Sequence, residues 1–290
     1  MKPRDFFLLL LIASVWGGSY IFIRILVPVL GPWGLVCARM LLAGAALLVI
    51  ARLLGQPWGE PRLWKHYLVV AVAASFTAQY LIAYSALTLN APTLAILNAT
   101  AAMFAALLSV RALGEPLRAG RAFGLLLGIA GVAMVVGFTP LAFTWEVILA
   151  FVASLAAAFG YAVANIYAVR KLAGRPPLEL AIAQNIYAGL LALPMGVPAI
   201  IAAWPPTPLI IGCLLTLALL STAAANWLYY ILMLRTSPTV ALSVTYLIPC
   251  FSLLWGLLFL NETITLLQYA GFGVVLFALF LVSGRRGVRA

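Results

Sequence analysis

The chain has 290 residues, of which 66% are hydrophobic and 8% are charged. A soluble domain cannot bury so large an apolar fraction, so the composition excludes an ordinary soluble globular protein. Lysine and arginine number 17 against 6 acidic residues, a formal net charge of +11. In a soluble protein this excess would suggest a nucleic-acid partner, but the positions of the charges along the chain favour another explanation.

Ten apolar runs, each long enough to cross a bilayer as a helix, lie between turn-forming or charged segments. The first run, which begins at Phe6, is too long for a signal-peptide core and lacks a clear small-x-small cleavage site, so we expect it to be a helix of the protein. The sequence therefore predicts an all-α, polytopic membrane protein. The ten predicted transmembrane helices are 6–27, 33–53, 66–87, 92–112, 121–138, 145–169, 178–203, 207–234, 238–259 and 264–283.

The basic residues alternate between the two sides of this arrangement. The loops that follow helices one, three, five, seven and nine contain no lysine or arginine. The other side, which comprises the termini, the remaining loops and the helix ends beside them, contains Lys2, Arg4, Arg52, Arg62, Lys65, Arg111, Arg118, Arg121, Arg170, Lys171, Arg175, Arg235, Arg285, Arg286 and Arg289. The positive-inside rule then predicts a multi-pass membrane protein with both termini in the cytoplasm. Anionic lipids of the inner leaflet, not nucleic acid, are the expected partner of the charge.

The two halves of the sequence resemble each other. Residues 84–92 match residues 230–238 at an offset of 146, and one inserted residue later Glu115 corresponds to Glu262. Each match is short, and their common order along the chain is the evidence for a repeat. At slightly different offsets, further matched pairs are Pro32 with Pro177 and Arg39 with Gln184.

The repeat predicts two units of five helices, residues 1–138 and residues 139–290. Because five crossings are an odd number, the second unit enters the membrane from the opposite side, and the repeat is inverted. Two inverted units can exchange conformations, so that one face closes while the other opens around a site near the midplane. This is the alternating-access mechanism of transporters.

Several of these residues resemble a known family. Helix one contains Trp16-Gly17-Gly18-Ser19, helix two contains Arg39, and helices four and nine begin with Pro92 and Pro238. Together with Glu115 and Glu262 at the ends of helices four and nine, they resemble the drug/metabolite transporter superfamily in its ten-helix EamA-type exporter branch. The chain is also similar to the YddG-like amino-acid exporters of bacteria. The resemblance covers the whole chain.

The resemblance implies a fold of five plus five inverted helices around a central cavity. Helices one, three, four, six, eight and nine are expected to line most of the cavity, and helices five and ten are expected to be peripheral. Pro249 in helix nine corresponds to a kink that is familiar in the family, whereas the matching position of helix four is Met103. The gating bend of helix four is therefore expected to be softer or to lie nearer Pro92, so Pro92, Pro238 and Pro249 are structural or gating candidates.

Polar and amphipathic residues at membrane depth are the candidates for substrate binding, because such groups are costly in lipid unless they face a cavity or one another. The alternative interpretations are headgroup anchoring for tyrosines such as Tyr84, Tyr229 and Tyr230, and interhelical hydrogen bonding for the asparagines. The predicted substrate-binding residues are Trp16, Gln79, Tyr80, Tyr84, Asn98, Tyr161, Asn165, Asn226 and Tyr246.

Arg39 is the most deeply placed charge, about 9 Å into helix two by the helical rise per residue. An unpaired charge at this depth is expensive, so we expect polar or carbonyl partners, with Glu146 and Glu262 as candidate partners. A functional role and a structural anchoring role are equal alternatives for this residue.

An aromatic, amide-containing and mostly uncharged cavity suits amino acids and similar metabolites. Because no carboxylate falls near the middle of a predicted helix, the sequence favours facilitated diffusion, a uniport, over proton coupling. We expect no metal and no cofactor, and a monomer suffices because both halves are present in one chain. The alternatives are an exporter of drugs, quaternary cations, nucleosides or sugar phosphates and a passive channel. A membrane enzyme is remote, because the motifs for metal or nucleophilic catalysis are missing.

Overall fold

The computed structural model describes residues 1–89, 91–114, 116–136, 144–260 and 265–283. Over these residues the chain is helical, and no strand is found. The α-helices are α1 (Pro3–Leu53), α2 (Trp64–Ala71), α3 (Ala78–Ser85), α4 (Ala91–Leu113), α5 (Ala119–Val136), α6 (Trp145–Lys171), α7 (Pro177–Ala202), α8 (Pro208–Thr216), α9 (Ala225–Arg235), α10 (Pro238–Leu242), α11 (Val244–Leu260) and α12 (Leu266–Ser283). A short 3-10 helix, η1 (Pro61–Leu63), precedes α2.

The described helices follow the ten predicted runs. Seven segments are long and apolar enough to cross a membrane, and three further apolar helices are shorter within the described residues. The ends also agree closely, since α7 spans Pro177–Ala202 where the sequence predicts 178–203. The prediction of an all-α, polytopic membrane protein is confirmed.

The first two predicted helices are joined at a kink and not by a loop. α1 runs from Pro3 to Leu53, and Gly31 alone leaves the helical conformation, with φ of 64°. A glycine adopts this left-handed conformation without the steric cost that a β-carbon would add. Pro32 directly follows, where a missing amide hydrogen costs little because a new helical segment begins there.

Two of the long helical segments contain a π-helical section. η2 (Val72–Thr77) separates α2 from α3, and η3 (Leu217–Ala224) separates α8 from α9. A π-helical section inserts an extra residue into the helical turn, which turns the following side chains to a different face. Both sections adjoin the cavity described below.

The ninth predicted helix is interrupted between α10 and α11. The interruption lies at Ser243, whereas Pro249, the residue expected to kink this helix, lies inside α11. The hydroxyls of Ser243 and Thr245 donate to the carbonyls of Val240 and Leu242, three residues earlier, at 2.6 and 2.8 Å. Such bonds compete with the regular helical bonds, which accounts for a break at this point.

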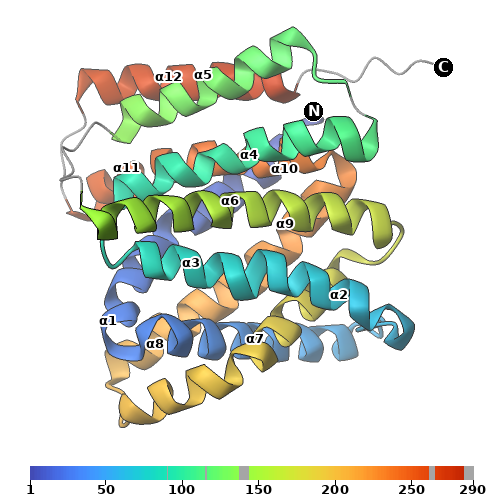
Figure 1. Cartoon of the computed structure of the whole chain (residues 1–290), viewed down its shortest axis with the longest axis vertical. Coiled ribbons are helices and arrows are strands. Elements are labelled where there is room, and N and C mark those ends of the chain that lie inside the picture. Colours follow the sequence, from blue (N-terminus) through green and yellow to red (C-terminus); the bar gives the residue numbers. More distant parts are fainter. Residues whose placement is uncertain (90, 115, 137–143, 261–264, 284–290) are drawn as a thin grey trace.

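The helices run across the longest axis of the molecule and stack along it (Figure 1). α5 and α12 lie together at one end of this axis, and α7 and α8 lie toward the other end, so the helices between them surround the middle of the bundle. Glycines allow the close approach of α5 and α12. A β-carbon at Gly124 would lie 2.7 Å from Cβ of Leu281, and one at Gly271 would lie 2.8 Å from the backbone nitrogen of Val135.

Ion pairs and polar contacts lie at the helix ends, some local and some between helices that are distant in sequence. Glu179, in the first turn of α7, is fully buried and accepts hydrogen bonds from Nε and Nη2 of Arg175, both at 2.8 Å. It also accepts a hydrogen bond from the hydroxyl of Tyr67 in α2. These bonds raise the pKa of the Arg175 guanidinium above its ordinary value, so it stays protonated at neutral pH. At another helix start, Asp5 lies 3.8 Å from Arg235 at the end of α9.

Candidate functional site

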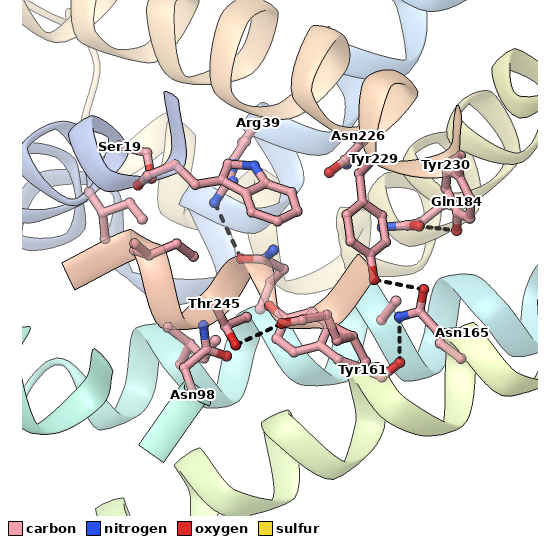
Figure 2. Close-up of a pocket in the computed structure, with 18 residues that line it drawn as sticks. Ser19, Arg39, Asn98, Tyr161, Asn165, Gln184, Asn226, Tyr229, Tyr230 and Thr245 are labelled. Atoms are coloured by element: carbon pink, nitrogen blue, oxygen red, sulfur yellow. Dashed lines mark hydrogen bonds between the residues drawn. The ribbon is translucent and has the colours of Figure 1, made fainter. Parts of the chain in front are cut away.

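A cavity lies between the helices in the middle of the bundle, and polar groups from both halves of the chain face it (Figure 2). Its walls come from α1, η2, α3, α4, α6, α7, α9, α10 and α11. The second part of α1 and α7 therefore also contribute, although the resemblance assigned the walls mainly to other helices. Six of the predicted substrate-binding residues line it, namely Trp16, Gln79, Asn98, Tyr161, Asn165 and Asn226.

Three predicted residues do not line the cavity. Successive residues of a helix point about 100° apart, and here Gln79 faces the cavity while Tyr80 points away from it. The ring of Tyr80 stacks on Trp33 instead, with centroids 3.9 Å apart, and Tyr84 stacks beside Tyr80 at 6.4 Å. Tyr246 is fully buried against α5, where its hydroxyl donates to the carbonyl of Leu125 at 3.3 Å.

The asparagine on α6 is held in a defined orientation. Nδ2 of Asn165 donates to the carbonyl of Tyr161, one turn earlier, at 2.7 Å. Its Oδ1 accepts a hydrogen bond from the hydroxyl of Tyr229 at 3.0 Å. The ring of Tyr229 in turn packs against Trp16 with centroids 5.4 Å apart. Aromatic faces and amide groups from α1, α6 and α9 thus form one wall.

Arg39 lines the cavity with only 7% of its surface exposed. Its Nε donates to the hydroxyl of Thr222 in η3 at 2.5 Å, and Nη1 donates to Oε1 of Gln79 in α3 at 3.3 Å. The expectation of polar partners is met by the side-chain oxygens of Thr222 and Gln79. Glu146 lies exposed in the first turn of α6, and Glu262 is outside the described residues.

Gln184 on α7 makes the corresponding contacts on the other side. Nε2 donates to the hydroxyl of Ser75 in η2 at 2.6 Å, and Oε1 accepts a hydrogen bond from the hydroxyl of Tyr230. Gln184, Tyr229 and Tyr230 line the cavity, yet none was among the predicted site residues. The match of Gln184 with Arg39 in the repeat was the signal that pointed to it. The two tyrosines had been interpreted as headgroup anchors, and their burial shows that they are not.

Of the prolines proposed for gating, Pro238 and Pro249 are not among the residues that line the cavity. Pro92 is the second residue of α4, and Pro238 is the first residue of α10. Ser237 caps α10, because its hydroxyl accepts a hydrogen bond from the backbone nitrogen of Val240 at 3.3 Å. Pro238 therefore begins a helix where its missing amide hydrogen has no cost. Whether these prolines take part in gating stays a prediction.

The described residues also limit the chemistry of the site. The cavity lining contains one arginine and no aspartate, glutamate, lysine or histidine among the residues described there. No three side chains of the histidine, cysteine, aspartate or glutamate type are grouped to hold a metal ion within the described ranges. The three cysteines, Cys37, Cys213 and Cys250, are free thiols buried in the bundle. The arrangement suits the reversible binding of a polar small molecule.

A helical bundle that spans a bilayer and encloses a polar cavity defines the class of integral membrane transporters. The EamA-like transporter family matches residues 5–137 and 144–284 of the chain. The protein therefore belongs to the EamA-like transporter family. It is a multi-pass membrane transporter and not an enzyme. This assignment is consistent with the drug/metabolite transporter superfamily.

Similar proteins support this assignment. An uncharacterised transporter of Archaeoglobus fulgidus is 28% identical over 270 residues, which cover 90% of this chain and 91% of that protein. A chloroplastic WAT1-related protein of Arabidopsis thaliana is 25% identical over 292 residues, covering 94% of this chain and 67% of that protein. A solved crystal structure has the same fold, with a TM-score of 0.81 and 15% identity over 98% of this chain and 99% of that one.

Proposed function

We propose that the protein exports small metabolites, above all amino acids, across the bacterial plasma membrane. The observation that carries this proposal is the composition of the central cavity, in which aromatic rings, carboxamides and one arginine face a common space. Amides and an arginine can hydrogen-bond the carboxylate and ammonium groups of an amino acid. Trp16 and Tyr229 offer faces on which apolar side chains of different size can pack.

Alternating access by two inverted halves is the proposed mechanism, and paired contacts across the cavity support it. Arg39 of the first half bonds to Thr222 in the π-helical η3, and Gln184 of the second half bonds to Ser75 in the π-helical η2. Arg39 and Gln184 are a matched pair of the repeat. The two bonds thus run from a matched pair of residues to two π-helical sections that begin at the same offset, 145, as a pseudo-two-fold relationship predicts.

The packing of α1 on α7 supports the same symmetry. A β-carbon at Gly44 would lie 2.5 Å from Cδ1 of Ile186, and one at Gly189 would lie 2.7 Å from Cδ2 of Leu41. Gly44 corresponds to Gly189, and Leu41 corresponds to Ile186, at the same offset of 145 that relates Arg39 to Gln184. The proposed units, residues 1–138 and residues 139–290, also agree with the two family-matched segments. Each chain contains both units, so we propose that a monomer transports.

We further propose that transport is a uniport with both termini in the cytoplasm. Proton-coupled transporters place a carboxylate or histidine where it can exchange a proton, and the described lining of this cavity holds neither. The solute then runs down its own gradient, which means export from a cell that produces it. The orientation rests on the asymmetry of lysine and arginine between the loops.

Counterflow in proteoliposomes tests the proposal. Vesicles loaded with unlabelled phenylalanine should transiently accumulate labelled phenylalanine, whereas vesicles loaded with tetraphenylphosphonium should not accumulate labelled tetraphenylphosphonium. Counterflow of the lipophilic cation without counterflow of any amino acid would overturn the proposed substrate class. Uphill uptake of phenylalanine driven by a pH gradient would overturn the uniport and leave the substrate class intact.

A further inference from the structure

Two polar residues of the cavity occupy matching positions in the two halves of the chain. Asn98 belongs to α4 and Thr245 to α11, and both line the cavity. They are separated by 147 residues, the offset that also relates Glu115 to Glu262. Resting on the proposed function, we infer that Asn98 and Thr245 together form the subsite that binds the α-ammonium group of the transported amino acid.

The break in the ninth predicted helix accounts for this offset. Residues 84–92 match residues 230–238 at an offset of 146, so the second half gains one residue after that segment. The helix α4 is continuous, whereas its counterpart is interrupted at Ser243 between α10 and α11. One extra residue at this interruption brings Thr245 into register with Asn98.

Both residues present buried oxygen atoms that can accept hydrogen bonds. Asn98 is 8% exposed, and its Oδ1 has no hydrogen-bond partner among the residues that the structure describes. Thr245 is 4% exposed, and its hydroxyl hydrogen is donated to the carbonyl of Leu242 at 2.8 Å, so its oxygen acts toward the cavity as an acceptor. A buried acceptor without a donor is unfavourable. The pair therefore favours a ligand group that carries several donors.

The subsite lies where the two halves of the chain meet. The helix α4 packs against α10 and α11, and Asn98 and Thr245 lie in the same part of the cavity in Figure 2. Two residues that match in an inverted repeat and line one cavity lie on either side of its pseudo-two-fold axis. A ligand group bound between them contacts both halves at once. It can keep both contacts while the halves exchange conformations.

A primary ammonium group suits two such acceptors. It carries three hydrogen-bond donors that point in different directions, whereas a hydroxyl carries one and a quaternary ammonium carries none. Its charge also strengthens the hydrogen bonds that it donates to neutral oxygens. In an amino acid the carboxylate of the same molecule balances this charge, so no net charge enters the cavity. The subsite therefore selects amino acids with a primary ammonium over betaines and quaternary cations.

Methylation of phenylalanine tests the subsite in the wild-type protein. N,N,N-trimethylphenylalanine keeps the positive charge and the carboxylate but has no N–H donor, and α-methylphenylalanine adds a methyl group while keeping all three donors. Binding is measured by displacement of labelled phenylalanine from protein in detergent. The trimethyl compound should bind about tenfold or more weakly than phenylalanine, because charge-assisted hydrogen bonds are lost. The α-methyl compound should bind within about threefold of phenylalanine.

Variants then assign the effect to the two residues. Asn98→Leu and Thr245→Val each replace an acceptor by an apolar group of similar size. Each should weaken phenylalanine about three- to tenfold and leave N,N,N-trimethylphenylalanine within about twofold of its wild-type affinity. The two variants should therefore lose much of the wild-type preference for the primary ammonium.

Matched controls come from hydroxyls in the same two regions that do not line the cavity. Thr100→Val removes a hydroxyl of α4 that donates to the carbonyl of Leu97. Ser243→Ala removes a bond to a carbonyl three residues earlier, as Thr245→Val does, and so controls for the effect on the helix break. Both controls should bind phenylalanine and its trimethyl derivative within about twofold of the wild type.

The outcomes distinguish this inference from the proposed function. Equal binding of phenylalanine and its trimethyl derivative by the wild type would overturn the ammonium subsite, even if amino acids are transported. The wild-type comparison needs no variant, so a variant that fails to fold does not protect the inference. A wild-type preference that Asn98→Leu and Thr245→Val both retain would assign the preference to bulk and would also overturn the subsite. Failure of every amino acid to bind or to show counterflow would overturn the proposed substrate class, and the subsite with it.

Discussion

Tyr246 lies where a side chain on Gly128 would have to be. A β-carbon at Gly128 would lie 2.6 Å from Cε2 of the Tyr246 ring, which is fully buried between α11 and α5. A contact this short does not occur between real atoms, so the ring has to move or the helices have to separate. Glycine is therefore required at position 128 by close packing.

Gly128→Ala should lower the melting temperature of the detergent-solubilised protein, by an amount equivalent to about 1–3 kcal/mol for overpacking in a tight core. The matched control is Gly273→Ala in α12, since a β-carbon there has no neighbour within 4 Å. The control should leave the melting temperature unchanged or raise it slightly, because alanine is the better helix former. Equal melting temperatures for the two variants would contradict the packing described for Tyr246.

Two buried tyrosines, one at the cavity wall and one outside the cavity, predict different effects on ligand binding. Tyr229→Phe removes the hydrogen bond to Asn165 at the cavity wall, so we expect phenylalanine affinity to fall about two- to tenfold. Tyr246→Phe removes a 3.3 Å bond to the carbonyl of Leu125 outside the cavity, so affinity should stay within about twofold. Displacement of labelled phenylalanine measures both. A larger loss of phenylalanine affinity for Tyr246→Phe than for Tyr229→Phe would indicate that Tyr246 belongs to the binding site.

Periodicity predicted the helices well but could not tell which polar residues share a cavity. Gln79 and Tyr80 are neighbours in sequence and equally suitable by residue type, yet one faces the cavity and the other stacks on Trp33. The difference depends on the rotation of the third helix, which the π-helical η2 alters. A local insertion of this kind leaves no clear mark in hydrophobic periodicity. Gln184 was visible only through its repeat partner, Arg39.

The position of a residue along its helix also gave a poor estimate of its environment in the membrane. Tyr229 and Tyr230 lie one and a half turns from Arg235, which made headgroup anchoring plausible. In the structure both are buried, and they reach the cavity because α9 passes through the middle of the bundle. The predicted ends of the helix were correct, but its place among the others was not encoded in its own sequence.

Glu179→Gln should destabilise the protein because it removes one member of a buried ion pair. The carboxylate is fully buried and accepts two hydrogen bonds from Arg175 and one from Tyr67. Loss of the charge leaves the partly exposed guanidinium without its counter-ion and weakens the hydrogen bonds at the buried position 179, at a cost of about 1–3 kcal/mol. The thermal unfolding of Glu179→Gln, Tyr67→Phe and the double variant should show coupling between the two residues. Glu146→Gln at an exposed helix start is the control and should unfold near the wild-type temperature.

The proposed orientation and inversion predict which positions an impermeant reagent can reach. Lys2 and Trp145 begin the first helices of the two halves, and both are exposed. In an inverted repeat they lie on opposite sides of the membrane, with Lys2 in the cytoplasm. Gln56 and Leu87 are exposed positions just beyond the ends of α1 and α3, so they calibrate the two sides. The measurement is maleimide labelling of single-cysteine variants in intact, right-side-out vesicles.

Leu87→Cys and Trp145→Cys should label in intact vesicles, and Lys2→Cys and Gln56→Cys should label only after permeabilisation. The native cysteines are all buried, so the parent protein should give a low background. Labelling of positions 2 and 145 from the same side would contradict the inversion, because five crossings cannot return the chain to its starting face. Reversed labelling of all four positions would instead retain the inversion and overturn the cytoplasmic placement of the N-terminus. The four positions therefore test the symmetry and the orientation separately.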